Sequence, residues 1–374
     1  MKPATNQQLE NYLKAKPRFI RNDYDSSLLN ELRERVQKRI KTIPEDRFLQ
    51  LRIKAILLPG IYFLIYIISL WSTQYAFFLL AYSLMGFMLV IIFLNLIHEV
   101  CHENLFVKKS YNRFYLYLFD LIGANSYMWK KRHVIFHHNF PNVTGWDSDI
   151  EKSKFVKVHP NDKGKWLTRY QHFIVFLYPF FLFNWFLIRD FKDFFSQTSI
   201  VKRLGPIEFK EFVKLFLFKI IFVFYIFVLP GLLTPFSYVQ VFWAGILMFI
   251  VAGAFGLLVL LPPHVNTKNT FPDVDENNNL PNTWLKHQLL TTNDVDEHNW
   301  FTRHVMANFN YHVAHHLFPN VSYLNAREVT DEIKSFCQEH QLPYKSFPLK
   351  TALVEHFRLI KKNGSEINIW EDDM

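Results

Sequence analysis

The fold is decided by the stretch Asn310-Tyr311-His312-Val313-Ala314-His315-His316-Leu317-Phe318-Pro319-Asn320. It holds three histidines within five residues, although the whole chain has 16 histidines among 374 residues. Two earlier stretches share this density, His98-Glu99-Val100-Cys101-His102 and His133-Val134-Ile135-Phe136-His137-His138. Because imidazole is a common metal ligand, we expect the fold to bring the three clusters together around one metal centre.

The rest of the chain is unusually apolar. Half of its residues are hydrophobic and 40 are Phe, which exceeds the usage of an ordinary soluble domain. The chain has four apolar runs, and two long stretches that cover most of them, residues 55–107 and 220–267, contain no Lys or Arg. The four runs cover about residues 55–71, 76–97, 215–233 and 238–262. Each can cross about 30 Å of hydrocarbon as a helix, and we predict four transmembrane helices in two hairpins.

Two further apolar segments, residues 111–129 and 168–188, are interrupted by polar or basic residues. If either spanned the bilayer, the histidine clusters would lie on opposite sides, so we expect both to be interfacial or re-entrant. Lys219, near the start of the third run, is expected to extend its ammonium to the interface. The hairpin turns lack Lys and Arg, whereas the histidine segments are flanked by them. The positive-inside rule therefore places the histidines on the cytoplasmic side.

This topology predicts three parts: a cytoplasmic N-terminal segment at 1–50, a membrane domain at 51–345 and a cytoplasmic tail at 346–374. Residues 26–43 have helical apolar spacing and suit either an interfacial helix or a helix packed on its own domain. Residues 326–339 are also expected to be helical. The net charge of +9 fits basic cytoplasmic loops, and we expect no nucleic-acid binding because no basic patch with interleaved aromatics occurs.

Spacing within the clusters indicates two metals. His98 and His102, like His133 and His137, lie four residues apart and share one face of a helix, while His138 is turned about 100° away and can reach a second ion. Imidazole ligands suit iron, zinc, copper or nickel. A four-coordinate zinc site would be over-ligated by so many histidines, whereas two irons would use them and keep positions open for dioxygen.

The three clusters, read as HxxxH, HxxxHH and HxxHH among membrane hairpins, resemble the membrane fatty acid desaturase family, and most closely its bacterial acyl-CoA or acyl-lipid members. The likeness covers about residues 50–345. It extends to Trp129-Lys130, Gly145-Trp146-Asp147-Ser148-Asp149-Ile150, Arg169-Tyr170-Gln171-His172, His287-Gln288-Leu289-Leu290-Thr291-Thr292 and Asn310-Tyr311. It implies an all-α integral membrane fold whose cytoplasmic helical cap carries a di-iron centre. It also implies an oxidoreductase that uses dioxygen to introduce a double bond into an acyl chain.

The resemblance further implies a ninth ligand at the end of the fourth span, where this chain has His264; the alternative is an interfacial histidine bonded to a backbone carbonyl. No catalytic residues are expected beyond the metal ligands. The complete expected ligand set is His98, His102, His133, His137, His138, His264, His312, His315 and His316. In the third cluster, relatives with a front-end preference often have Gln where this chain has His312, so the position of the double bond stays open.

Three carboxylates are candidates for holding the ligands in place. Glu99 departs from the more usual HDxxH pattern and either orients a histidine or is a solvated helix-end carboxylate. Asp147 and Asp149 either bond the ligands, contact a lipid headgroup, or belong to a polar turn. Cys101 is expected to be a small apolar filler, and His298 and His304 to be surface or supporting residues.

The partners follow from the resemblance and from what the chain lacks. The sequence contains no HPGG stretch typical of a cytochrome domain and only two cysteines, so we expect electrons from a separate ferredoxin or cytochrome b5-like protein. The substrate would be an acyl-CoA, an acyl-carrier-protein or a lipid-bound acyl chain, in a bacterial inner membrane. A hydroxylase or acetylenase on the same scaffold remains an alternative. A membrane metal transporter is disfavoured because the spans hold almost no ionisable residues.

Overall fold

The described part of the chain is mostly helical. The computed structural model describes residues 16–44, 47–150, 156–161, 166–174, 188–196 and 199–365. These residues form two compact units. The first, here called the membrane unit, comprises the described residues within 48–130 and 176–257. The second, the histidine unit, comprises those within 7–47, 131–175 and 258–374.

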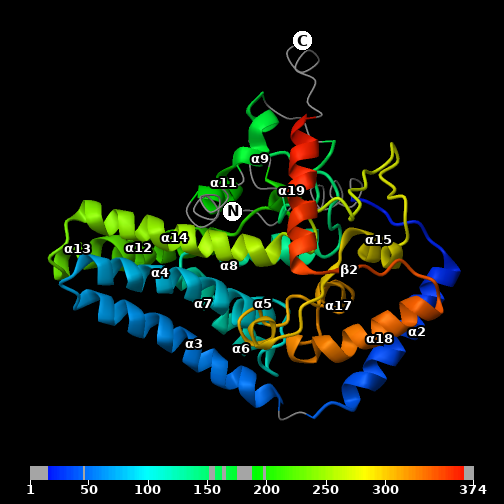
Figure 1. Cartoon of the computed structure of the whole chain (residues 1–374), viewed down its shortest axis with the longest axis horizontal. Helices are drawn as coiled ribbons and strands as arrows, with labels where there is room; N and C mark the ends of the chain where they lie inside the picture. The colour runs from blue at the N-terminus through cyan, green and yellow to red at the C-terminus, as the bar shows by residue number, and fades with distance from the viewer. Residues whose placement is uncertain are drawn as a thin grey trace. The chain divides into compact units, whose positions relative to one another are not determined.

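Among the described residues, four helices are long and apolar enough to cross a membrane, which agrees with the four spans predicted. They run over Arg47–Leu70, Tyr75–Cys101, Phe209–Leu233 and Tyr238–Leu260. The first is α3 (Arg47–Leu70) and the last is α14 (Tyr238–Leu260). The second joins α4 (Tyr75–Ile92), η1 (Phe93–Ile97) and α5 (His98–Cys101). The third joins α12 (Phe209–Val223), η7 (Phe224–Val228) and α13 (Leu229–Leu233). Figure 1 shows the antiparallel hairpins that they form.

The spans pack closely at small residues and share hydrogen bonds at a π-turn. Gly86 of α4 lies against the Met248 carbonyl of α14, where a Cβ would overlap the oxygen. The π-turn η7 leaves carbonyls without their usual helical partners. Tyr66 donates to the Tyr225 carbonyl at 2.5 Å and Tyr82 donates to the Ile226 carbonyl at 2.7 Å. Tyrosines from the first hairpin therefore satisfy the backbone of the second, as hydrocarbon requires.

The segment 111–129 forms no span. It is divided among α6 (Lys109–Tyr115), α7 (Tyr117–Leu121) and α8 (Ser126–Lys130). Of 168–188, most lies outside the described residues, and its beginning falls in η3 (Trp166–Tyr170) and α9 (Gln171–Ile174). The short helices α11 (Asp190–Phe195) and η6 (Ile200–Leu204) follow.

Lys219 does not reach the interface as expected. Its side chain is buried, and its ammonium donates to Asp190 at 2.8 Å and to the Gly123 carbonyl at 2.5 Å. The expectation was wrong because the sequence does not show that α11 and the turn after α7 supply fixed acceptors. A buried ammonium is stable only when it is paired in this way.

The histidine unit is built from helices far apart in the chain. They are α2 (Asp23–Lys41), η2 (Lys131–His137), α15 (Trp284–Thr291), α16 (Trp300–His304), α17 (His312–Leu317), η8 (Tyr323–Asn325), α18 (Ala326–Glu339) and α19 (Leu349–Ser365). Strands β1 (Asp294–Val295) and β2 (Ser346–Phe347) pair in parallel. The bounds of α18 match the helix expected at 326–339. Within the segment expected as a tail, α19 is tied down where Asn363 donates to the Val158 carbonyl at 2.6 Å.

The core of the histidine unit explains the amphipathic pattern at 26–43. The apolar face of α2, including Leu28, Leu32 and Val36, is buried in a cluster with residues of α15, α17 and α18. Of the two alternatives, the structure therefore supports a helix packed on its own domain. This packing holds α17, the helix with the densest histidines, against α15 and α18.

Candidate metal centre

Three segments of the histidine unit bring seven of the expected ligands together. They are η2, the turn that follows α14, and α17. In η2 the His138 amide donates to the His133 carbonyl at 3.0 Å, five residues back, which is the bond of a π-turn. This turn places the Nε2 atoms of His133 and His138 3.1 Å apart. In an α-helix His133 would pair with His137, and His138 would point about 100° away. This expectation was wrong because the π-turn adds one residue to the turn and pairs His133 with His138 instead.

The seven histidines divide into two groups. His133, His138 and His315 form the first, here called site A, with ligand atoms within 4.8 Å of one another. His137, His264, His312 and His316 form the second, site B, within the same distance. In α17 the one-face pair His312 and His316 goes to one group and the adjacent His315 to the other, as its spacing predicts. His315 is partly exposed and the other six are buried.

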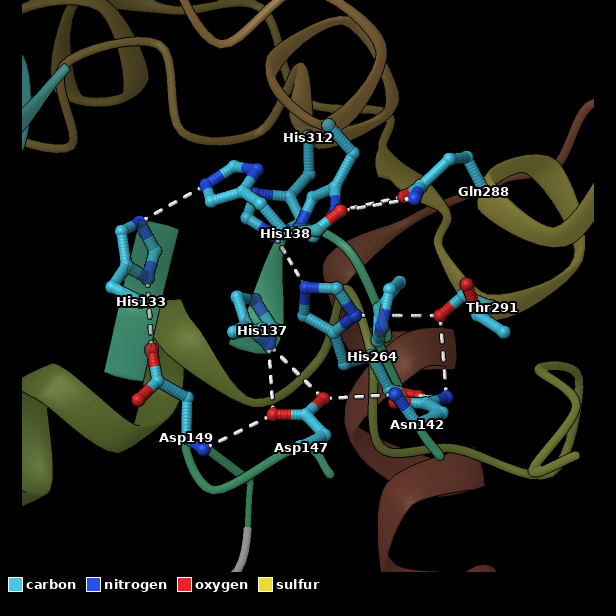
Figure 2. A network of polar contacts seen from close by, with 12 residues as sticks. His133, His137, His138, Asn142, Asp147, Asp149, His264, Gln288, Thr291 and His312 are labelled. Atoms are coloured by element: carbon cyan, nitrogen blue, oxygen red, sulfur yellow. Dashed lines mark hydrogen bonds and ion pairs between the residues drawn. The ribbon is translucent and has the colours of Figure 1, made fainter. Parts of the chain in front are cut away.

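Two aspartates orient histidines of η2. The Nδ1 of His133 donates to Asp149 at 2.8 Å, and the Nδ1 of His137 donates to Asp147 at 2.9 Å. Asp147 also accepts hydrogen bonds from two backbone N–H groups, that of Asn142 at 2.8 Å and that of Asp149 at 3.0 Å. Figure 2 shows this chain of contacts beneath the rings. Of the alternatives for Asp147 and Asp149, the structure supports the first, because the two carboxylates contact His137 and His133.

Neutral acceptors orient one histidine from each of the other segments. The Nδ1 of His264 faces the Thr291 carbonyl at 3.3 Å, and the Nδ1 of His316 faces the Gln288 amide oxygen at 3.1 Å. The Gln288 amide is itself fixed, because its NH2 group donates to the His138 carbonyl at 3.0 Å. Each of these rings carries its proton on Nδ1 and presents an Nε2 lone pair.

The electrostatics keep the rings neutral. Burial holds the pKa of His264 and of His316 well below the ordinary value. Burial also lowers the pKa of His133, although its bond to Asp149 opposes the change. Burial would raise the pKa of Asp149, but the bond to His133 outweighs it and the pKa is lowered. The result is a set of neutral imidazoles backed by ionised carboxylates, which is the protonation state that metal ligation needs.

The donor set fits metal ions. The Nε2 of His316 is buried and makes no hydrogen bond among the described residues. The Nε2 atoms of His264 and His312 lie 2.6 Å apart and therefore converge on a common point. Each histidine oriented through Nδ1 has the second hydrogen bond that metal-ligating histidines almost always make. Nitrogen-only sites of this kind suit late first-row metals and are poor sites for magnesium or calcium.

The first histidine cluster lies in the membrane unit. His98 and His102 are both buried at the end of the second span, with ring centroids 5.2 Å apart. The π-turn η1 precedes them, and its Asn95 side chain accepts from Lys54 at 2.6 Å. Glu99 is buried rather than solvated. Cys101 is also buried, as an apolar filler would be.

Three residues that position the ligands carry no sequence signal of their own. Asn142 has a left-handed backbone, with φ of 60°. Its side chain donates to the carbonyls of His264, Thr270 and Thr291 at 3.0–3.2 Å. Gln288 and Thr291 lie in the stretch that contributes to the family likeness, but nothing in their spacing predicts which ring they would contact.

The remaining histidines lie outside both groups. His287 contacts the Pro141 carbonyl at 3.1 Å, and burial lowers its pKa to about 4. His356 contacts the Val265 carbonyl at 2.6 Å. His298 and His304 line a separate cavity.

The chain is similar to known proteins over most of its length. Residues 73–348 match the family model described as fatty acid desaturase. An acyl-lipid (8-3)-desaturase of Physcomitrium patens is 28% identical over 320 residues, which cover 83% of this chain and 66% of that protein. An sn-1 linoleoyl-lipid 6-desaturase of Synechocystis is 28% identical over 82% of this chain and 89% of that protein. Human fatty acid desaturase 3 is 26% identical over 74% of this chain and 58% of its own length. No solved structure matches the chain.

Proposed function

Because the chain belongs to the fatty acid desaturase family, we propose that it introduces a double bond into a lipid-bound acyl chain with dioxygen and two iron ions. The observation that carries the iron assignment is the shared orientation of His133, His137, His264 and His316. Each turns Nδ1 to a fixed acceptor and Nε2 toward other histidines. Bound iron would supply the activation of dioxygen that removal of two unactivated hydrogens requires.

The proposed ligands are all nine histidines of the three-cluster pattern. Sites A and B supply seven, and we include His98 and His102 in the same centre because of their spacing, their burial and the family pattern. Asp147 and Asp149 are assigned to orient His137 and His133 and to favour their metal-bound state. Asn142 is assigned to fix the backbone at His264 and Thr291. Gln288 is assigned to connect the backbone at His138 with the ring of His316.

The remaining assignments are coarser. The printed names of the Physcomitrium patens and Synechocystis relatives refer to lipid-bound acyl chains. Four helices long and apolar enough to cross a membrane support a substrate that resides in the bilayer. We propose that the histidines face the cytoplasm, in a bacterial inner membrane, because the hairpin turns lack basic residues. We also propose that an acidic ferredoxin or cytochrome b5-like protein supplies electrons, since the chain is basic.

The test is expression in a host of known lipid composition, followed by fatty acid profiling with double-bond location. The wild-type chain should produce a new alkene, and the purified protein should contain about two irons. His138→Ala and His316→Ala should lose iron and the alkene, whereas the matched variant His340→Ala, at a histidine whose Nε2 lies 3.7 Å from Glu31 outside both sites, should keep both.

Two results would contradict the proposal. A His138→Ala variant with full iron content and activity would remove the iron assignment. A new hydroxy acid without a new alkene would favour a hydroxylase on the same scaffold, because hydrogen abstraction is shared and only the later outcome differs.

A further inference from the structure

A polar cavity of about 400 Å³ lies in the histidine unit, apart from sites A and B. Its walls come from α16, the loop that leads to α17, and the beginning of α18. Three guanidinium groups border it, those of Arg47, Arg303 and Arg327, together with the single carboxylate of Glu328. The metal centre does not use any of these residues.

The charges leave a net positive cavity. Arg47 is already paired with Glu328, with Nη1 2.5 Å from the carboxylate oxygen. Among the residues that the structure describes, neither Arg303 nor Arg327 lies within 4.0 Å of a carboxylate oxygen. Two guanidinium groups without a carboxylate partner on one cavity wall match an anion with several oxygens, because guanidinium binds phosphate through parallel hydrogen bonds.

The wall that carries Arg303 is fixed. Asn299 begins α16 with a capping box: its side chain accepts from the Thr302 amide at 3.0 Å, and the Thr302 hydroxyl accepts from the Asn299 amide at 3.1 Å. Asn308 donates to the Tyr323 carbonyl at 2.9 Å. A cavity with such walls is preorganised, and a ligand would not have to order them on binding.

The cavity is also linked to the metal centre through the chain. Tyr311 lines it and bonds His298 through its hydroxyl at 3.0 Å. The next residue, His312, belongs to site B. A group bound in this cavity is therefore held at a fixed place relative to one metal ligand, as a substrate headgroup must be if the acyl chain is to reach the irons in one register.

We infer that this cavity binds the phosphate of the acyl carrier through Arg303 and Arg327. The inference rests on the proposed function, because it names the group that holds the acyl chain. Exposed aromatics beside Arg303 favour a phospholipid as the source: Trp300 is 70% exposed and Phe301 is 41% exposed, and aromatic residues beside basic ones are typical of the lipid headgroup layer. Coenzyme A carries the same chemistry and is the competing source.

The experiment measures binding to the full-length iron-loaded protein in detergent. The probes are dihexanoyl phosphatidylglycerol, coenzyme A, and dihexanoylglycerol, which lacks the phosphate. The phosphate-bearing probe should bind, and Arg303→Gln and Arg327→Gln should each raise its Kd by about tenfold, the loss expected for one charge-assisted hydrogen bond. Arg33→Gln, at an exposed arginine of α2, should bind as the wild type does. Arg303→Lys should restore part of the affinity.

The arms separate the possible results. Loss of phosphatidylglycerol binding in the arginine variants assigns the phosphate to a phospholipid, and loss of coenzyme A binding alone assigns it to a thioester carrier. Equal binding of dihexanoylglycerol, or unchanged Kd values in a folded Arg303→Gln/Arg327→Gln double variant, would overturn the inference. The variants should raise KM. Their kcat, measured at saturating substrate, and their iron content should be unchanged. A wild-type protein that binds the probe but forms no alkene would overturn the proposed function instead.

Discussion

At the scale of single residues, the histidine sites depend on which ring nitrogen is protonated. A ring that donates from Nδ1 must present a lone pair at Nε2, so Asp147, Asp149, Gln288 and the Thr291 carbonyl determine the tautomers of the ligands they contact. Asp147 has the widest influence because it also accepts two backbone amides. The position of the His137 ring is therefore coupled to the loop that follows η2.

Asp147→Asn tests this dependence. The substitution keeps the size of the side chain but lets its amide group donate toward His137, which would favour the wrong tautomer. We expect iron affinity to fall by about 10- to 100-fold, measured by competition with a chelator, while the fold is retained. Glu276→Gln, at an exposed carboxylate in a loop, is the matched control and should leave the affinity unchanged. Equal iron affinity in both variants would exclude an orienting role for Asp147.

The sequence reveals the candidate histidines better than the residues that hold them in place. His312 and His316 share one group and His315 joins the other, as their spacing predicts, whereas the grouping of His133, His137 and His138 depends on the π-turn of η2. Asn142 is not predictable, since its importance comes from a left-handed backbone that aims one amide at carbonyls 122 to 149 residues away. Such contacts depend on tertiary structure, and no local pattern encodes them.

At the scale of elements, several helices of this chain contain π-turns, which depart from regular α-helical geometry. The π-turns η1, η2 and η7 lie before the first histidine cluster, within the second and in the third span. The residues of η2 have ordinary helical spacing, so the sequence predicts an α-helix there and the wrong partner for His133. The four spans, by contrast, are predictable because long uncharged runs admit almost no other arrangement in hydrocarbon.

Close packing of α4 on α14 provides a test at this scale. Gly86→Ala would push a methyl group into the Met248 carbonyl, and overpacking of this kind costs about 1–3 kcal/mol. We expect a lower Tm in detergent. Gly60→Ala, in α3, is the matched control because nothing lies within 4 Å of the added carbon, and it should unfold at the wild-type temperature or slightly above. A Gly86→Ala protein as stable as Gly60→Ala would show that the helices do not pack as described.

At the scale of the whole molecule, the chain combines apolar hairpins with a helical unit that carries most of the histidines. The proposed topology puts the two hairpin turns on one side of the bilayer and the histidine unit on the other. The native cysteines make this easy to examine, because Cys101 and Cys337 are both buried and should react slowly with a membrane-impermeant thiol reagent.

Single cysteines introduced at exposed positions should therefore report the side of the membrane. Thr73→Cys and Pro235→Cys, in the hairpin turns, should be labelled in intact cells. Glu276→Cys and Lys350→Cys, in the histidine unit, should be labelled only after the membrane is opened. The readout is the labelled fraction of each variant relative to the wild type. Labelling of Thr73→Cys and Glu276→Cys from the same side would rule out the four-span topology.

The order of the segments has a consequence for how the protein is made. The histidine unit is assembled from described residues within 7–47, 131–175 and 258–374, and the membrane unit is made from stretches between them. A ribosome therefore delivers all four spans to the translocation machinery before it synthesises α17 at His312–Leu317. Site B contains His312 and His316, so under the proposed function its metal would be acquired late, by a chain already inserted, and newly made protein would depend on the iron available at the membrane surface.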